Sequence, residues 1–409
     1  MKKALQFVAF FLAACAAADS QTVPVAPASG LPVSGNLHYS LSSSQNSTFG
    51  GSYGNWNANT TSASLDYASD NERHPFGLSY SGGYTSDITG PSYGTGLFQR
   101  LLLSQGFAWR KWNVTISDDI SYRPQAPTTG FSGIAGIGEP IGGSGSTPVS
   151  SQSILTLNAR VVENDANGTI EHVLNHVTKF NVGGGSLLLR YPDGNGLDTN
   201  TEMANAGLTF RLDGRNSLAV SYMLSEFSYP GFTVSFTSQS ALFGYSRMWS
   251  RKVSTNVSAG PQWIGSSDSA FLPHSTTITA NASINYKFRF VSADLAYDRS
   301  ANGGAGYLLG SEEDRIHADF SRAFRTSLTA GLEGGYLRTT GLTENGVTNA
   351  KYGGIQVSKR LSRYLNVFGN YSLMDQSSSS QLPANALNNL LQVFSFGIVY
   401  SPRETRLRH

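Results

Sequence analysis

Residues 365–373 read Leu-Asn-Val-Phe-Gly-Asn-Tyr-Ser-Leu, an alternation of apolar and polar residues that decides the fold. Residues 291–298, Val-Ser-Ala-Asp-Leu-Ala-Tyr-Asp, repeat this alternation. Because successive side chains of a strand point to opposite faces, each stretch has one apolar face and one hydrated face. Between Asn36 and Tyr400 the chain returns many times to roughly ten such residues, a short basic turn and roughly ten more. The pattern predicts an all-β fold, an antiparallel up-and-down β-barrel that crosses a membrane.

Composition agrees with a barrel and disagrees with a helical membrane protein. Hydrophobic residues make up 39% of the chain and charged residues 14%, and the mean hydropathy is −0.20. A barrel needs apolar residues only at alternate positions. After the N-terminal segment, no stretch approaches the roughly 20 consecutive apolar residues of a membrane helix. The net charge of +2 argues against nucleic acid as a partner.

The N-terminus has the form of an export signal, which predicts a place in the outer membrane of a Gram-negative cell. Lys2 and Lys3 precede a short apolar run, and small residues follow it. Cleavage after Ala18 defines a signal peptide of residues 1–18, and the alternative is lipoprotein cleavage before Cys15, which makes Cys15 the lipidation candidate. Residues 19–33 contain several prolines and are expected to form a periplasmic linker. A single cysteine leaves the protein without a disulfide.

Short turns and longer loops divide the rest of the chain into strands. Outer-membrane barrels have short periplasmic turns and longer extracellular loops. We count about eighteen strands over residues 34–401, with sixteen as the alternative, and expect a periplasmic tail at residues 402–409. Short turns are predicted at residues 110–111, 176–178, 213–215, 249–251, 288–289, 324–325 and 361–363. Long loops are predicted at residues 192–201, 265–274, 300–310, 339–349 and 376–389.

The parity of the alternation assigns a face to each side chain. In residues 278–288 the apolar positions include Ile278 and Ile284, and the polar positions between them include Asn281 and Lys287. A Lys or Arg on the lipid face at the membrane midplane costs about 2–4 kcal/mol, so the polar parity must face a wet interior. The pore-lining candidates are Asp294, Asp298, Arg315, His317, Asp319, Glu333, Lys287 and Arg211. Their charges steer solutes or ions, or they form ion pairs that keep the wall rigid.

The longest segment without alternation, residues 123–150, is rich in glycine. A loop of this length and composition cannot pack a core of its own. In porins a long loop folds inward and narrows the pore, and by that resemblance Arg123 and Glu139 are constriction-loop candidates. The alternative is a disordered surface loop.

The candidate enzyme motifs of the sequence mostly fail, although chance pairings of Ser with one of the seven His are easy. His172 and His176 would lie about 13 Å apart on a strand, too far to share one metal ion. The glycine-rich residues 303–306 follow an expected strand but open no helix, so they do not form a phosphate loop. We therefore expect no catalytic residue, no metal site and no cofactor.

Two segments resemble known outer-membrane proteins. Residues 393–400, Val-Phe-Ser-Phe-Gly-Ile-Val-Tyr, resemble the closing strand that the barrel-assembly machinery recognises, although here nine residues follow it. Residues 245–251 and 257–263 resemble uncharacterised outer-membrane barrels, some of them associated with exopolysaccharide and exosortase systems. The resemblance implies a barrel in contact with outer-membrane lipids and the assembly machinery.

Two functions remain open at this point. An empty barrel of sixteen to eighteen strands leaves an aqueous lumen, which predicts a porin-like channel for small hydrophilic solutes. The alternative is a non-conducting scaffold or binding barrel associated with polysaccharide export. A homo-oligomer would use ordinary lipid-facing positions, so the sequence does not distinguish a monomer from an oligomer.

Overall fold

The computed structural model describes residues 35–50, 54–90, 95–125, 154, 159–267, 274–304, 306–324, 327–343, 346–379, 388–403 and 405–407. The predicted signal peptide, Cys15, the linker and Glu139 lie outside these residues. Within them, no helix has the length and apolar character needed to span a membrane.

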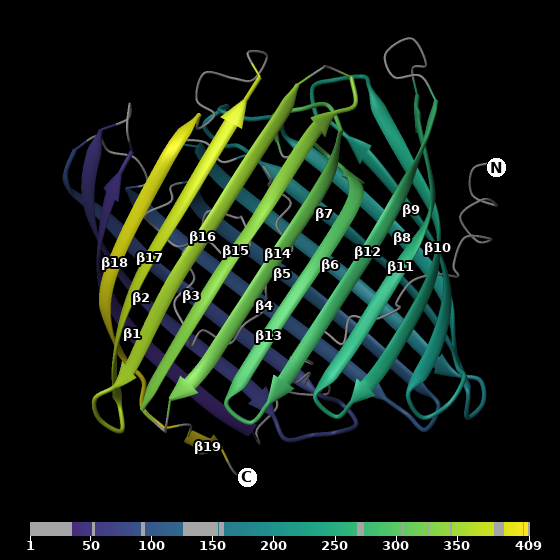
Figure 1. Ribbon diagram of the computed structural model, residues 1–409, viewed down its shortest axis with the longest axis horizontal. Helices are drawn as coiled ribbons and strands as arrows, with labels where there is room; N and C mark the ends of the chain where they lie inside the picture. The colour runs from purple at the N-terminus through teal and green to yellow at the C-terminus, as the bar shows by residue number, and fades with distance from the viewer. Residues whose placement is uncertain are drawn as a thin grey trace.

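Eighteen long antiparallel strands form the wall of the barrel (Figure 1). They are β1 (Gly35–Phe49), β2 (Asn55–Ser69), β3 (Phe76–Thr89), β4 (Gly96–Ala108), β5 (Trp112–Gln125), β6 (Ala159–Val173), β7 (Thr178–Arg190), β8 (Thr199–Arg211), β9 (Asn216–Ser228), β10 (Ser235–Ser250), β11 (Val253–Ser266), β12 (Ser275–Phe288), β13 (Val291–Asn302), β14 (Ser311–Phe324), β15 (Leu328–Gly341), β16 (Val347–Arg360), β17 (Leu365–Ser378) and β18 (Asn389–Tyr400).

The sheet closes because β1 pairs with β2 on one side and with β18 on the other. Each of the strands from β2 to β17 pairs with its two neighbours in sequence, so the topology is up-and-down. The prediction of a closed antiparallel barrel of eighteen strands is confirmed. The short strand β19 (Thr405–Leu407) pairs with the beginning of β1 (Figure 1). It lies within residues 402–409, for which the sequence predicts a tail.

The two ends of the barrel differ in their connections. We name the end that holds the short connections, such as residues 212–215, the turn end, and the opposite end the loop end. Each predicted turn lies at a junction between strands, but four of them share residues with a strand. Thr178 begins β7, β10 continues to Ser250 past a register irregularity, and Phe288 and Phe324 end β12 and β14. Arg289, after β12, has a φ of 47°. At the loop end the strands run a few residues further than predicted, because ladder pairing continues into the predicted loops.

The outer face of the barrel is apolar, as the parity of the sequence predicts. Phe243 is 64% exposed and Ile278 is 61% exposed. At the turn end, cations lie over aromatic rings on this face: Arg247 is 4.0 Å from the ring centroid of Trp249, and Lys252 is 3.5 Å from that of Phe288. An exposed apolar band with an aromatic girdle on a closed barrel is the surface of a membrane-spanning protein.

Candidate functional site

One charged wall faces the lumen on β13, β14 and β15. On β14, Ile316 and Phe320 are exposed on the outer face, so Arg315, His317 and Asp319, which have the opposite parity, point inward. The register then places further candidates opposite Arg315 and Asp319. Asp294 and Glu333 are the partners of Asp319 on the two adjacent strands, and Asp298 is the partner of Arg315.

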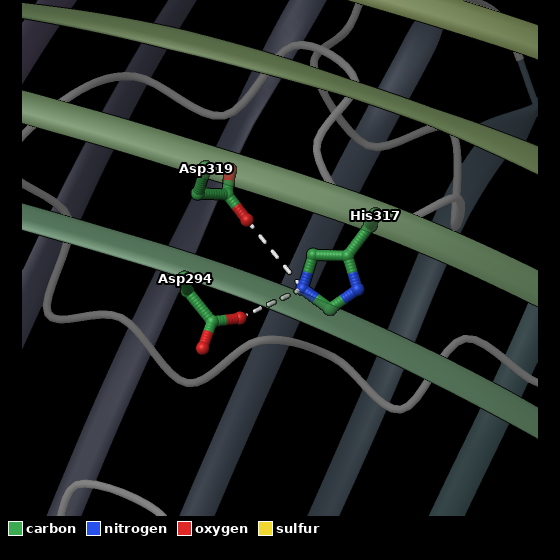
Figure 2. Close-up of side chains that lie close together, drawn as sticks. All are labelled: Asp294, His317 and Asp319. Carbon is green, nitrogen blue, oxygen red and sulfur yellow. Dashed lines mark ion pairs between the residues drawn. The ribbon is translucent and has the colours of Figure 1, made fainter. Parts of the chain in front are cut away.

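The carboxylates of Asp294 and Asp319 both point toward one ring nitrogen of His317 (Figure 2). His317 Nε2 lies 3.4 Å from Asp294 Oδ1 and 3.5 Å from Asp319 Oδ2. Figure 2 shows the second ring nitrogen pointing away from both carboxylates. Each of the three residues offers one metal-ligating atom, and these atoms lie within 4.8 Å of one another.

The Arg315 guanidinium of the same wall forms an ion pair with Glu313. Arg315 Nη2 lies 2.5 Å from Glu313 Oε1, and the Glu313 side chain is only 5% exposed. Asp298, opposite Arg315, accepts a hydrogen bond from Ser300 Oγ at 3.3 Å. We name Asp294, Asp298, Glu313, Arg315, His317, Asp319 and Glu333 the acidic wall, which contains five carboxylates and one guanidinium.

A second charged wall lies on β4, β5 and β6, and sequence reasoning missed most of it. Arg100 holds Asp119 through both Nε and Nη2, at 3.0 Å to Oδ1 and 2.6 Å to Oδ2. Arg123 Nη2 lies 2.7 Å from Glu163 Oε2, and both side chains are under 10% exposed. The apolar run Leu101-Leu102-Leu103 hides the alternation of β4, so only the register brings these charges together.

The two charged walls face each other. In a ring of eighteen strands, β5 and β14 are nine positions apart and therefore lie on opposite sides of the lumen. Arg123, predicted from its loop as a constriction residue, belongs to the strand wall instead, because β5 continues to Gln125. Lys287 and Arg211 point inward beside short turns, opposite Ser292 and Ser217, so they lie apart from the centre of either wall.

The loop between β13 and β14 extends over part of the barrel mouth at the loop end and contacts the segments beside β8 and β9. Leu197, before β8, donates its backbone N–H to Gly306 O at 2.6 Å, and Tyr229, after β9, donates its hydroxyl to Gly303 O at 3.2 Å. Strands β8 and β13 are five positions apart in the ring of eighteen, so these contacts bridge part of the opening. Gly306 has a φ of +76°, and a Cβ there would collide with the Tyr191 ring.

Apolar side chains pack around this loop, which we name the mouth loop (described residues 303–304 and 306–310). Tyr307 meets Tyr191 edge to face, with 5.6 Å between the ring centroids, and both belong to a buried cluster with Leu308 and Ile154. Burial also raises the pKa of the Tyr229 hydroxyl. Sequence reasoning predicted an ordinary extracellular loop here, and the apolar Tyr307-Leu308-Leu309 run was the signal that could have indicated an inward fold.

No protein-family model and no curated protein matches this chain. Solved structures that resemble it include OccK2 (OpdF) of Pseudomonas aeruginosa, with 13% sequence identity, a TM-score of 0.47 and coverage of 90% of this chain and 97% of that chain. OccAB4 of Acinetobacter baumannii has 8% identity, a TM-score of 0.48 and coverage of 91% and 98%. A BenF-like porin of Pseudomonas fluorescens Pf-5 has 13% identity, a TM-score of 0.47 and coverage of 91% and 98%. Similarity at this level extends at most to the fold.

Proposed function

We propose that this protein is a porin-like channel of the outer membrane that passes small hydrophilic solutes, with its turn end in the periplasm. The observation that carries the proposal is the pair of charged walls on opposite sides of the lumen. Charged side chains on a barrel interior need water or ionic partners, and barrels of sixteen to eighteen strands are wide enough to hold an aqueous channel.

The sign of the acidic wall favours cations. The acidic wall contains five carboxylates and one guanidinium. In the opposite wall, Arg100 pairs with Asp119 and Arg123 pairs with Glu163, so these four residues carry no net positive charge. Rings or clusters of acidic side chains in a pore select cations. We therefore propose a cation-preferring channel.

The test is single-channel recording of refolded protein in a planar bilayer, with a chelator on both sides to remove divalent metals. The reversal potential under a salt gradient gives the selectivity. Glu333→Gln removes one charge from the acidic wall and should lower the cation preference. Glu312→Gln makes the same chemical change on the outer face of the barrel, where Glu312 pairs with Arg299 at 2.8 Å, and should leave selectivity unchanged. An anion-selective pore, or equal effects of the two variants, contradicts the cation-preferring channel.

A second function is favoured by the mouth loop. Its buried apolar contacts hold this loop over part of the mouth. A barrel whose mouth is fully covered would be a non-conducting scaffold or binding barrel, and polysaccharide export is the process with which we associate it. Folded protein that gives no conductance steps supports this second function and overturns the channel.

A further inference from the structure

We propose that Asp294, His317 and Asp319 form a binding site for a divalent transition-metal ion of the Zn²⁺ type on the lumen wall. The site does not depend on whether the barrel conducts. Sequence reasoning expected no metal site, because the three residues lie on two strands and only the β13–β14 register brings them together.

The distances within the cluster fit a metal better than a hydrogen bond. Good N–H···O hydrogen bonds have heavy-atom distances of about 2.7–3.2 Å, and one N–H has a single proton to donate. The two carboxylate oxygens instead lie 3.4 and 3.5 Å from the same nitrogen, His317 Nε2. Ligands at about 2.0–2.2 Å from a tetrahedral Zn²⁺ lie about 3.3–3.6 Å from one another. The two distances to His317 Nε2 match two edges of such a tetrahedron.

The negative charges of the acidic wall also favour the binding of a cation. Asp294 and Asp319 are direct partners in the β13–β14 ladder, and Glu333 is the partner of Asp319 on β15. Like charges directly opposite each other destabilise a pair of strands. Arg315, on the same face, lies 2.5 Å from Glu313 and is engaged by that carboxylate. A divalent ion bound between Asp294 and Asp319 would remove their repulsion.

The donor set decides which ions fit. Imidazole nitrogen suits Zn²⁺, Cu²⁺, Ni²⁺ and Fe²⁺, whereas Mg²⁺ prefers an all-oxygen octahedron with several waters. Three protein ligands leave at least one coordination position for water. Asp319 has a side chain that is 50% exposed, and those of Asp294 and His317 are 32% and 30% exposed, so an ion in the lumen can reach the site.

The test is calorimetric titration of the refolded, metal-stripped barrel with Zn²⁺, using protein without a histidine tag. We expect one tight site per barrel that millimolar Mg²⁺ does not occupy. His317→Gln should weaken this site at least about tenfold, because a three-ligand site loses its only nitrogen. Asp319→Asn should weaken it as well. Co²⁺ gives a second readout, since the visible spectrum of bound Co²⁺ reports its coordination geometry.

The matched control is His38→Gln. His38 also points into the lumen but faces one carboxylate, Asp66, at 3.8 Å, so its replacement should leave Zn²⁺ binding unchanged. Heat-dependent gel mobility verifies that each variant is a folded barrel. Equal Zn²⁺ affinity in His317→Gln and the parent protein, or loss of the site in His38→Gln, overturns the proposal. The Zn²⁺ titration gives a result even if the barrel does not conduct, so the metal site and the channel are tested independently.

Discussion

The ion pair between Arg123 and Glu163 is buried in the lumen wall near the loop end, and its replacement tests whether water reaches it. Their side chains are 7% and 9% exposed, and 2.7 Å separates Arg123 Nη2 from Glu163 Oε2. Removal of one partner from a buried pair leaves an uncompensated charge and costs about 3–5 kcal/mol. Glu163→Gln keeps the shape and one acceptor oxygen, so we expect the low end of that range, about 3 kcal/mol of unfolding free energy.

A matched control lies on the same strand. Glu171 of β6 pairs with Lys179 at 2.9 Å, but these side chains are 38% and 47% exposed near the turn end. Ion pairs in contact with water contribute at most about 1 kcal/mol, so Glu171→Gln should cost less than about 1 kcal/mol. The two variants carry the same chemical change on the same face of one strand and differ in burial.

Equilibrium unfolding in denaturant, with the barrel refolded in detergent, measures both losses of stability. A difference of about 2 kcal/mol or more between the variants supports a water-excluded environment around the Arg123–Glu163 pair. If Glu163→Gln costs no more than Glu171→Gln, water reaches Arg123, and the argument that this pair is shielded from the aqueous lumen is refuted.

Three further predictions follow from the face assignment, the mouth and the turns. Ala282→Lys places a charge on the outer face at the middle of β12 and should cost about 2–4 kcal/mol of stability, whereas Asn281→Lys, one residue away on the lumen face, should cost little; equal losses in denaturant unfolding contradict the faces. Leu308→Ala weakens the packing of the mouth loop on its buried cluster and should enlarge the single-channel conductance step, and an unchanged step in a folded variant shows that the mouth loop does not limit the current. The Asp213 carboxylate accepts hydrogen bonds from its own turn, chiefly from the backbone N–H of Arg215, and these bonds lower the pKa of Asp213. The stability that they add is therefore fully present above the pKa of an unfolded aspartate and is lost as pH falls through the lowered pKa. A carboxyl-detected NMR titration that gives Asp213 an ordinary pKa contradicts this prediction.

Local pattern accounts for much of the barrel. The alternation around Leu332 and Glu333, for example, requires one face in lipid and one in water whatever the neighbouring strands are. Eighteen strands, their turns and the inward parity of Arg315, His317 and Asp319 could therefore be predicted from the sequence. Where alternation is obscured, as in Leu101-Leu102-Leu103, the paired charges of Arg100 and Asp119 could not.

Other features depend on partners that are distant in the chain. The convergence of two carboxylates on His317 requires the register between β13 and β14, because a shift by one residue would turn one set of side chains to the other face. The burial of Arg123 with Glu163 requires β6 to lie beside β5 across an interval of more than thirty residues.

The alternation of side chains is a property of each strand alone, so the sequence was sufficient for the class of fold, the membrane-facing surface and the polar lining. Closure of the ring determined which strands face each other across the lumen. It placed the β4–β6 wall across the lumen from the β13–β15 wall, and it brought the mouth loop against Tyr191 and Tyr229. Such distances arise only when β1 meets β18, because an open sheet has no interior in which residues of non-adjacent strands can meet.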